Sequence, residues 1–123
     1  MQHFHWVTAR SKCTPEELFG KLRDRVKGDV QTAVRVTGRK IEFSPTSNEL
    51  FHVARIKAGG NQTLAAVGFQ LVGHQIVVIE QGGTSHAARA ALQHGSCRLT
   101  DDDGRCFELW EFSRDALEDL FFG

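Results

Sequence analysis

Neither an excess of charge nor a long apolar segment is present in this sequence. Its 15 Lys and Arg residues balance 15 Asp and Glu residues, which leaves a formal net charge of zero. Proteins that bind nucleic acid through its phosphates generally need a surplus of basic residues, so nucleic acid is not expected as a partner. The longest purely aliphatic run, Ile76–Ile79, is far shorter than the roughly 20 residues that cross a bilayer, so no membrane association is expected either.

Cysteine is scarce as well, and its number is odd. Cys13, Cys97 and Cys106 cannot all pair within one chain. The first residues, MQHFHWVTARSK, lack the cationic segment followed by an apolar segment that marks a secretory signal. We therefore expect a cytoplasmic protein whose cysteines are reduced. No cofactor is expected.

The composition is otherwise that of an ordinary globular protein. Hydrophobic residues make up 41% of the chain and charged residues 24%, which argues against disorder. A chain of 123 residues can bury a core without disulfides or metals. Because there is no internal repeat or linker, residues 1–123 are expected to form a single domain.

What the sequence does have is a sorted distribution of charge. Residues 1–57 contain eleven basic and six acidic residues, a net charge of +5, whereas residues 58–123 contain four basic and nine acidic residues, a net charge of −5. If the two halves form separate surfaces, they can steer a charged partner or a second copy of the chain. Our main hypothesis is therefore a non-catalytic interaction protein that binds a protein partner or associates with itself as a homodimer. Four basic residues of the first predicted helix form either a docking strip for an acidic partner or simply a solvated face: Lys21, Arg23, Arg25 and Lys27.

Two local signals near the N-terminus predict a helix followed by a hairpin. The segment Thr14-Pro15-Glu16-Glu17 is a capping box with proline at the first helical position, and it predicts a helix that ends at Gly28. Inside this helix Gly20 costs about 1 kcal/mol relative to alanine, which indicates a closely packed neighbour there. Gly38-Arg39 is interpreted as the loop of a two-residue hairpin between residues 34–37 and 40–43, because that register pairs apolar residues on one face and opposite charges on the other.

The rest of the chain predicts an α+β fold with a mostly antiparallel sheet of about six to eight strands and three helices packed on it. The expected order is β-α-β-β-β-β-β-α-β-β-α, because most strands are joined by hairpin-length turns. The turns are residues 45–48, 58–61, Gly73-His74 and Asp101–Gly104. The other predicted elements are strands at residues 3–8, 50–57, 64–72, 76–80, 96–100 and 105–112, a helix at residues 85–94, and a final helix capped by Ser113 with Ala116, Leu117, Leu120 and Phe121 on its inner face.

A candidate site for an anionic small molecule lies in the segment IVVIEQGGTSHAAR, residues 76–89. A strand leads there into a glycine-rich loop and then into a predicted helix, whose free N–H groups favour a phosphate or carboxylate. The residues that would hold the anion are Gly82, Gly83, Thr84, Ser85, His86 and Arg89. The alternative is an ordinary strand-to-helix connection capped by Thr84 or Ser85.

Residues 76–94 resemble the phosphoribosyl-diphosphate loop of the phosphoribosyltransferases, in which a buried strand and a Thr/Gly-rich loop precede a helix. The resemblance implies a ligand that carries phosphate. It departs from the family where Glu80 is followed by Gln81 rather than by a second acidic residue, so the family's activity is not carried over.

Two further candidates lie near the N-terminus. His3 and His5 alternate along a predicted strand, so both rings project from one face, about 7 Å apart, and could share a metal ion. Otherwise they are surface histidines of a chain terminus. Cys13 lies just before a helix N-cap, where the helix dipole favours a thiolate, and a histidine of the preceding strand could serve as its base in an enzyme. Otherwise Cys13 is an inert packing residue.

Overall fold

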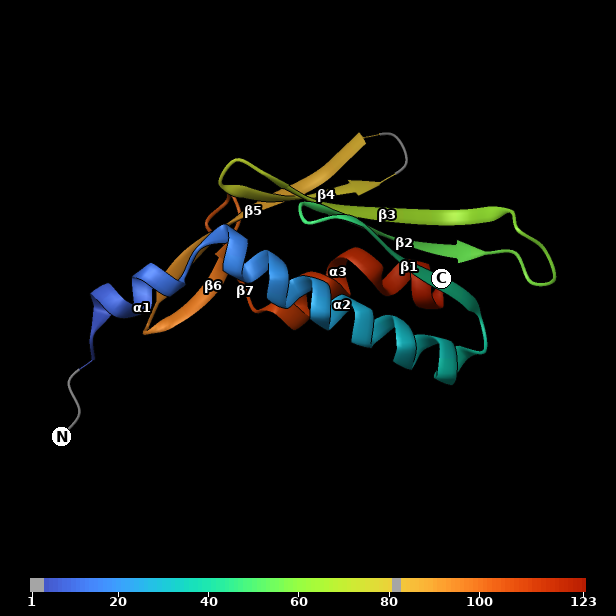
Figure 1. The fold of residues 1–123 in the computed structure, drawn as a ribbon, viewed down its shortest axis with the longest axis horizontal. Coiled ribbons are helices and arrows are strands. Elements are labelled where there is room, and N and C mark those ends of the chain that lie inside the picture. The colour runs from blue at the N-terminus through green and yellow to red at the C-terminus, as the bar shows by residue number, and fades with distance from the viewer. Residues whose placement is uncertain (1–3, 81–82) are drawn as a thin grey trace.

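The computed structural model describes residues 4–80 and 83–123, and these residues form three helices and a seven-stranded antiparallel sheet (Figure 1). The helices are α1 (Trp6–Lys12), α2 (Pro15–Thr37) and α3 (Leu109–Phe122). The strands are β1 (Lys40–Ser47), β2 (Leu50–Ile56), β3 (Thr63–Val72), β4 (Gln75–Glu80), β5 (Gly83–Gln93), β6 (Ser96–Thr100) and β7 (Cys106–Phe107). The predicted α+β class, with a mostly antiparallel sheet and three helices, is confirmed.

Each strand pairs with the next strand along the chain, so the sheet order runs from β1 to β7 without a crossover. Such a meander needs only short connections between antiparallel strands. Gly73, at φ +60°, and His74 join β3 to β4 as predicted. The predicted turns at residues 58–61 and 101–104 also join neighbouring strands.

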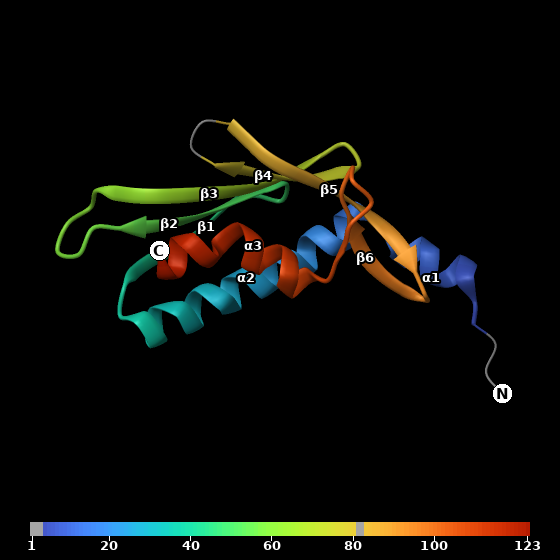
Figure 2. The same cartoon turned by 180° about the vertical axis from the view of Figure 1, so that it is seen from behind.

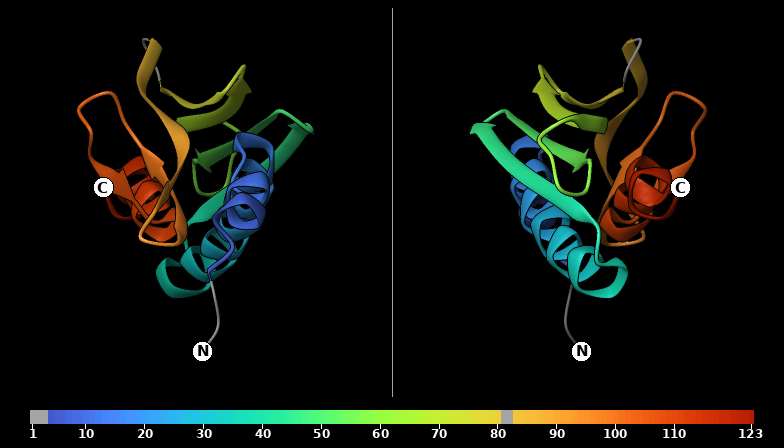
Figure 3. Two further views of the ribbon diagram at one scale, coloured as in Figure 1. Left: turned by 90° about the vertical axis from the view of Figure 1, so that its left-hand side faces the viewer. Right: turned by 90° about the vertical axis from the view of Figure 1, so that its right-hand side faces the viewer.

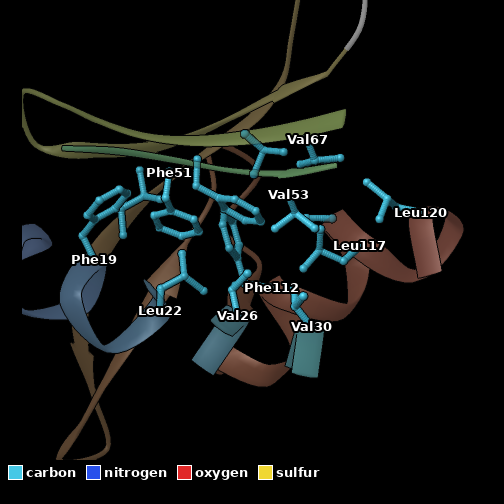
Figure 4. Packing of buried hydrophobic residues seen from close by; sticks show 14 of the residues in the cluster. Phe19, Leu22, Val26, Val30, Phe51, Val53, Val67, Phe112, Leu117 and Leu120 are labelled. Atoms are coloured by element: carbon cyan, nitrogen blue, oxygen red, sulfur yellow. The ribbon is translucent and has the colours of Figure 1, made fainter. Parts of the chain in front are cut away.

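The helices α2 and α3 lie side by side on one face of the curved sheet (Figure 3). The helix α1 lies at one end of the molecule, and the C-terminal end of α3 lies toward the other end (Figures 1 and 2). The hydrophobic core fills the space between the two long helices and the sheet. Figure 4 shows Phe19 from α2, Phe51 from β2 and Phe112 from α3 pointing into this space. The Phe51 ring lies 5.2 Å from the Phe19 ring and 4.8 Å from the Phe69 ring, centroid to centroid.

The helix α2 begins as predicted but continues past its predicted end. The hydroxyl oxygen of Thr14 accepts a hydrogen bond from the backbone N–H of Glu17 at 3.2 Å, and Pro15 occupies the first helical position. The helix ends only at Gly38, which adopts φ +70°. The predicted stop at Gly28 and the predicted hairpin over residues 34–43 are therefore wrong.

The reason for the longer helix is its buried stripe. Val30 and Ala33 extend the apolar series of Leu18, Leu22 and Val26 at helical spacing, and all five side chains are buried. Packing of this stripe against the sheet outweighs the cost of a glycine in the helix interior. The expectation of a close neighbour at Gly20 is also wrong, because a Cβ atom built there has no atom within 4 Å.

Two further elements differ from the prediction. The alternating residues 4–8 form no strand, since the chain from Trp6 to Lys12 forms α1. The alanine-rich residues 85–94, predicted as a helix, belong to β5, which pairs with β4 and β6. His94 at φ 49° and Gly95 at φ 81° form the turn between β5 and β6, and two successive positive φ angles are typical of a tight hairpin.

The last helix begins earlier than predicted. The strand expected over residues 105–112 is short, and α3 starts at Leu109. Its N-terminus is a capping box in which Glu108 is the N-cap and the Glu111 carboxylate accepts from the backbone N–H of Glu108 at 3.1 Å. Ser113 therefore lies inside the helix rather than at its cap. The predicted inner face of this helix is confirmed as buried.

Candidate functional site

A groove of about 450 Å³ runs between the second half of α2 and the whole of α3. We call it the α2–α3 groove, and its lining is mostly apolar. Residues at helical spacing project into it from both helices, because positions three, four and seven apart lie on one face of a helix. The lining residues are Asp29, Thr32, Ala33 and Val36 from α2, and Trp110, Ser113, Arg114, Glu118, Phe121 and Phe122 from α3.

Large apolar side chains in the α2–α3 groove are open to solvent. Val36 is 68% exposed, Phe122 63% and Trp110 45%. The Trp110 ring is fixed in place, because its Nε1 donates to the Glu108 carboxylate at 2.8 Å and the Arg114 guanidinium lies 5.1 Å above it. A gathering of exposed apolar side chains in a concave site is typical of binding surfaces rather than of ordinary exterior.

The floor of the groove contains a polar link between the two helices. Ser113 is only 1% exposed, and its hydroxyl donates to a carboxylate oxygen of Asp29 at 2.8 Å. Glu118 lies farther along the same groove. In the described part of the chain neither Asp29 nor Glu118 is paired with a cation. The Arg114 guanidinium is engaged with Asp115 at 3.2 Å. The groove is therefore mostly apolar, and its lining contains two carboxylates that form no ion pair among the described residues.

Two arginines from the basic first half of the chain hold the end of α3. Arg39 donates to the backbone oxygens of Phe121 at 3.0 Å and Gly123 at 2.8 Å. Arg55 donates to the backbone oxygens of Leu120 at 3.3 Å and Gly123 at 2.9 Å. The last carbonyls of a helix lack intrahelical donors and carry partial negative charge, so cationic side chains stabilise them. Two basic residues of the first half are thus engaged with backbone oxygens at the end of α3.

The predicted anion site does not contain the helix on which it depended. Residues 83–93 form β5, so no helix N-terminus follows the glycine-rich loop. Gly82 lies outside the described residues, and so do the side chains of Thr84 and Ser85. Gly83 is described and adopts φ +129°. Without the helix, nothing among the described residues supports binding of an anion at this loop.

His86 and Arg89, the two charged candidates for that site, do not face one another. They are three residues apart on a strand, and so they lie on opposite faces of the sheet. The His86 ring packs edge-on against Phe112 with centroids 5.3 Å apart, on the side of the helices. Arg89 lies on the other face and is exposed.

The predicted metal pair is not supported either. His3 lies outside the described residues, and His5 is the exposed N-cap of α1 rather than a residue of a strand. The spacing argument, which required a strand, is therefore wrong. Within residues 4–80 and 83–123, no three His, Cys, Asp or Glu side chains come together as a metal site requires.

Cys13 is not available as a nucleophile, because its sulfur is bonded to that of Cys97. The disulfide joins the residue before α2 to β6 across 84 positions of sequence. The expectation that all cysteines are reduced is therefore wrong for this pair. Cys106 is a half-buried free thiol. Disulfides are typical of oxidising compartments, so this one does not support the predicted cytoplasmic location.

The acidic segment after β6 is a structured turn. The Asp101 carboxylate accepts from the backbone N–H groups of Asp103 at 3.0 Å and Arg105 at 2.9 Å, and from Arg105 Nε at 3.1 Å. Burial alone would raise the pKa of Asp101, but the hydrogen bonds and the charge of Arg105 outweigh it and lower that pKa below its usual value. This carboxylate therefore serves the turn rather than a ligand.

No helix formed by the described residues has the length and the apolar character needed to cross a bilayer. None of the family models, none of the curated proteins and none of the solved structures compared with the chain matches it. Evidence on function therefore comes from the site itself. The α2–α3 groove was not predicted from the sequence. Val36 was assigned to the apolar face of the predicted hairpin, Trp110 to the predicted strand over residues 105–112, and Phe122 to no buried face.

Proposed function

We propose that this protein is a non-catalytic interaction protein, and that the α2–α3 groove binds a segment of a protein partner that carries apolar and basic side chains. The observation that carries the proposal is the exposure of Val36, Trp110 and Phe122 around a concave surface. The carboxylates of this surface, Asp29 and Glu118, form no ion pair among the described residues, and Arg114, which also lines it, is paired with Asp115.

The chemistry of the groove indicates what fits it. Tryptophan contributes strongly to protein interfaces when it lies in a pocket, because it buries a large area with little loss of side-chain freedom. A groove between two helices with apolar walls is a common receptor for an amphipathic segment. The carboxylates add selectivity, since an acidic segment would meet like charge and a basic one opposite charge. The proposal thus keeps recognition by charge, as suggested by the sequence, but limits it to the α2–α3 groove.

Tryptophan fluorescence can test this proposal directly. The chain has two tryptophans, so the Trp6→Phe variant leaves Trp110, in the groove, as the only one. Two synthetic helical peptides with the same apolar residues, one carrying lysine and the other glutamate, are titrated into the dilute variant. The basic peptide should shift the Trp110 emission to the blue in a saturable manner. Its affinity should exceed that of the acidic peptide about tenfold, which corresponds to about 1.4 kcal/mol from two carboxylates.

Matched variants locate the binding. Glu118→Lys should reduce or reverse the preference for the basic peptide, whereas Glu42→Lys, an exposed change on β1, should leave it unchanged. Phe122→Ser should weaken both peptides, whereas Val72→Ser, which alters a residue 50% exposed on β3, should weaken neither. If neither peptide changes the Trp110 emission, the proposal is wrong.

A further inference from the structure

The N-terminal segment of the chain, residues 4–12, exposes apolar side chains that its own fold covers only in part, since the Phe4 ring also lies beside Gly95. Trp6 is 65% exposed, Val7 61% and Phe4 59%. None of the seven residues of α1 is buried. Figures 1 and 2 both show α1 extending beyond the body formed by the sheet and the two long helices. We call residues 4–12 the N-terminal arm.

The arm and the α2–α3 groove have complementary chemistry. The arm contains Arg10 and Lys12 and no acidic residue. The groove is apolar and contains Asp29 and Glu118, neither of which is paired with a cation among the described residues. Building on the function proposed above, we propose that the partner segment is the N-terminal arm of a second copy of this chain. Each arm fills the groove of the other copy, and the two copies form a reciprocal dimer.

The arm of the same copy cannot fill the groove without losing structure. The Cys13–Cys97 disulfide fixes the end of the arm to β6, and Arg10 ties α1 to the backbone oxygen of Cys13 at 2.8 Å. From Cys13 to Asp29 the chain rises about 24 Å along α2. In Figure 1 α1 lies beyond the N-terminal end of α2, whereas the second half of α2 lines the groove.

A second copy removes this obstacle. When two copies lie antiparallel, the arm of each one reaches the groove end of the other. Two identical contacts related by a twofold axis then close the assembly, which is the commonest symmetry of homo-oligomers. Each contact would bury Trp6 of one copy beside Trp110 of its partner copy.

Sedimentation equilibrium of the disulfide-bonded full chain over a range of concentrations tests the proposal. We expect a monomer–dimer equilibrium. Trp6→Ser in the arm and Phe122→Ser in the groove should each raise the dimer dissociation constant at least tenfold, because each change removes a central aromatic side chain from both contacts. Val72→Ser is the matched control and should leave the constant unchanged. All three positions are half or more exposed, so the variants should fold, which far-UV circular dichroism can verify.

Mixing the two variants provides the sharper test. A heterodimer of Trp6→Ser with Phe122→Ser keeps one intact contact, the arm of the groove variant in the groove of the arm variant. Its other contact carries both substitutions, and because Trp6 and Phe122 belong to the same proposed contact, losing both should cost less than the sum of the two single losses. The mixture should therefore associate more tightly than either variant alone. The proposed exchange of arms is wrong if neither substitution changes the dimer dissociation constant. It is also wrong if the mixture associates no more tightly than each variant alone.

The failure of this inference is distinguishable from failure of the proposed function. A wild-type chain that stays monomeric while the basic peptide still binds at Trp110 overturns the dimer and leaves the groove as a receptor for another protein. A chain that neither dimerises nor binds the peptide overturns both.

Discussion

The hydrogen bond between Ser113 and Asp29 offers the most direct test of how the α2–α3 groove is built. It joins residues 84 positions apart, one on each helix, at an oxygen–oxygen distance of 2.8 Å. Ser113 is almost wholly buried, and Asp29 is half-buried. Replacing Ser113 with alanine removes the donor and leaves the Asp29 carboxylate to water and to the groove.

The expected loss of stability follows from the charge and burial of the partners. A hydrogen bond to a charged group contributes about 1.5–3 kcal/mol to folding. Because Asp29 is partly open to solvent and can regain water, the lower part of that range applies, and Ser113→Ala should destabilise the protein by about 1–2 kcal/mol. For a domain of this size that corresponds to a fall of roughly 4–8 °C in Tm. The basic peptide should also bind the groove more weakly, because the spacing of α2 and α3 is no longer fixed.

The assay is a double-mutant cycle measured by urea unfolding. It compares wild type, Ser113→Ala, Asp29→Ala and the double variant, with Ser96→Ala at the exposed first residue of β6 as the control. The control should change the free energy of unfolding by less than about 0.5 kcal/mol. If the two single losses simply add, within about 0.5 kcal/mol, the side chains do not interact in solution and this account of the groove floor is wrong.

Three other predictions concern the helix, the cysteines and the acidic turn. Gly28→Ala should stabilise the protein by up to about 1 kcal/mol in urea unfolding, since no atom lies within 4 Å of the added Cβ, and a loss would indicate a hidden contact there. Protein unfolded in an alkylating reagent without reductant should carry one alkylated cysteine, Cys106, and protein reduced before alkylation should carry three; three without reduction would rule out the disulfide. The stability that Asp101 contributes through its lowered pKa should be present above about pH 4 and lost as the pH falls through the pKa of the folded state. The free energy of unfolding of Asp101→Asn should therefore depend less on pH in the acid range than that of the wild type. Identical acid unfolding of the two proteins would contradict a lowered pKa at Asp101.

The sequence specified the meander well because its turns carry local signals. Gly73-His74 and Asp101–Gly104 contain residues that favour turns whatever surrounds them, and both lie where expected. The capping box at Thr14 is equally local, since its partner is three residues away. Such signals survive in isolation, so a single sequence suffices to find them.

The wrong predictions of secondary structure concern segments whose local conformational preference differs from the conformation that their tertiary contacts require. Alanine favours a helix, but residues 83–93 lie between two strands that need a partner, and the backbone hydrogen bonds of the sheet decide their conformation. The opposite happened over residues 30–37, where β-branched residues suggested a strand. There the stripe that runs from Val26 through Val30 to Ala33 continues the face that packs on the sheet. Whether such a segment forms a helix or a strand depends on its tertiary neighbours, which its own local sequence does not reveal.

The α2–α3 groove could not be predicted from the sequence for a related reason. Its walls come from segments about eighty residues apart, and its shape depends on the distance between two helices. From the sequence, Val36 was expected in a hairpin and Trp110 in a strand, and only Phe122 had no assigned place.

The salt dependence of association distinguishes recognition by the α2–α3 groove from recognition by two extended surfaces of opposite charge. Arg39 and Arg55 belong to the basic half of the chain, yet both are engaged with the carbonyl end of α3. The charges of each proposed contact are few: Lys12 and Arg10, which also donates to the backbone oxygen of Cys13, against two carboxylates in the groove. Exposed pairs of this kind contribute about 0.2–1 kcal/mol each, and the twofold dimer has up to four of them, so high salt should weaken the dimer by about fourfold to several hundredfold while the apolar contact persists. Association that vanishes at high salt and is insensitive to Trp6→Ser would instead mean that extended charged surfaces drive it, as the sorted sequence first suggested.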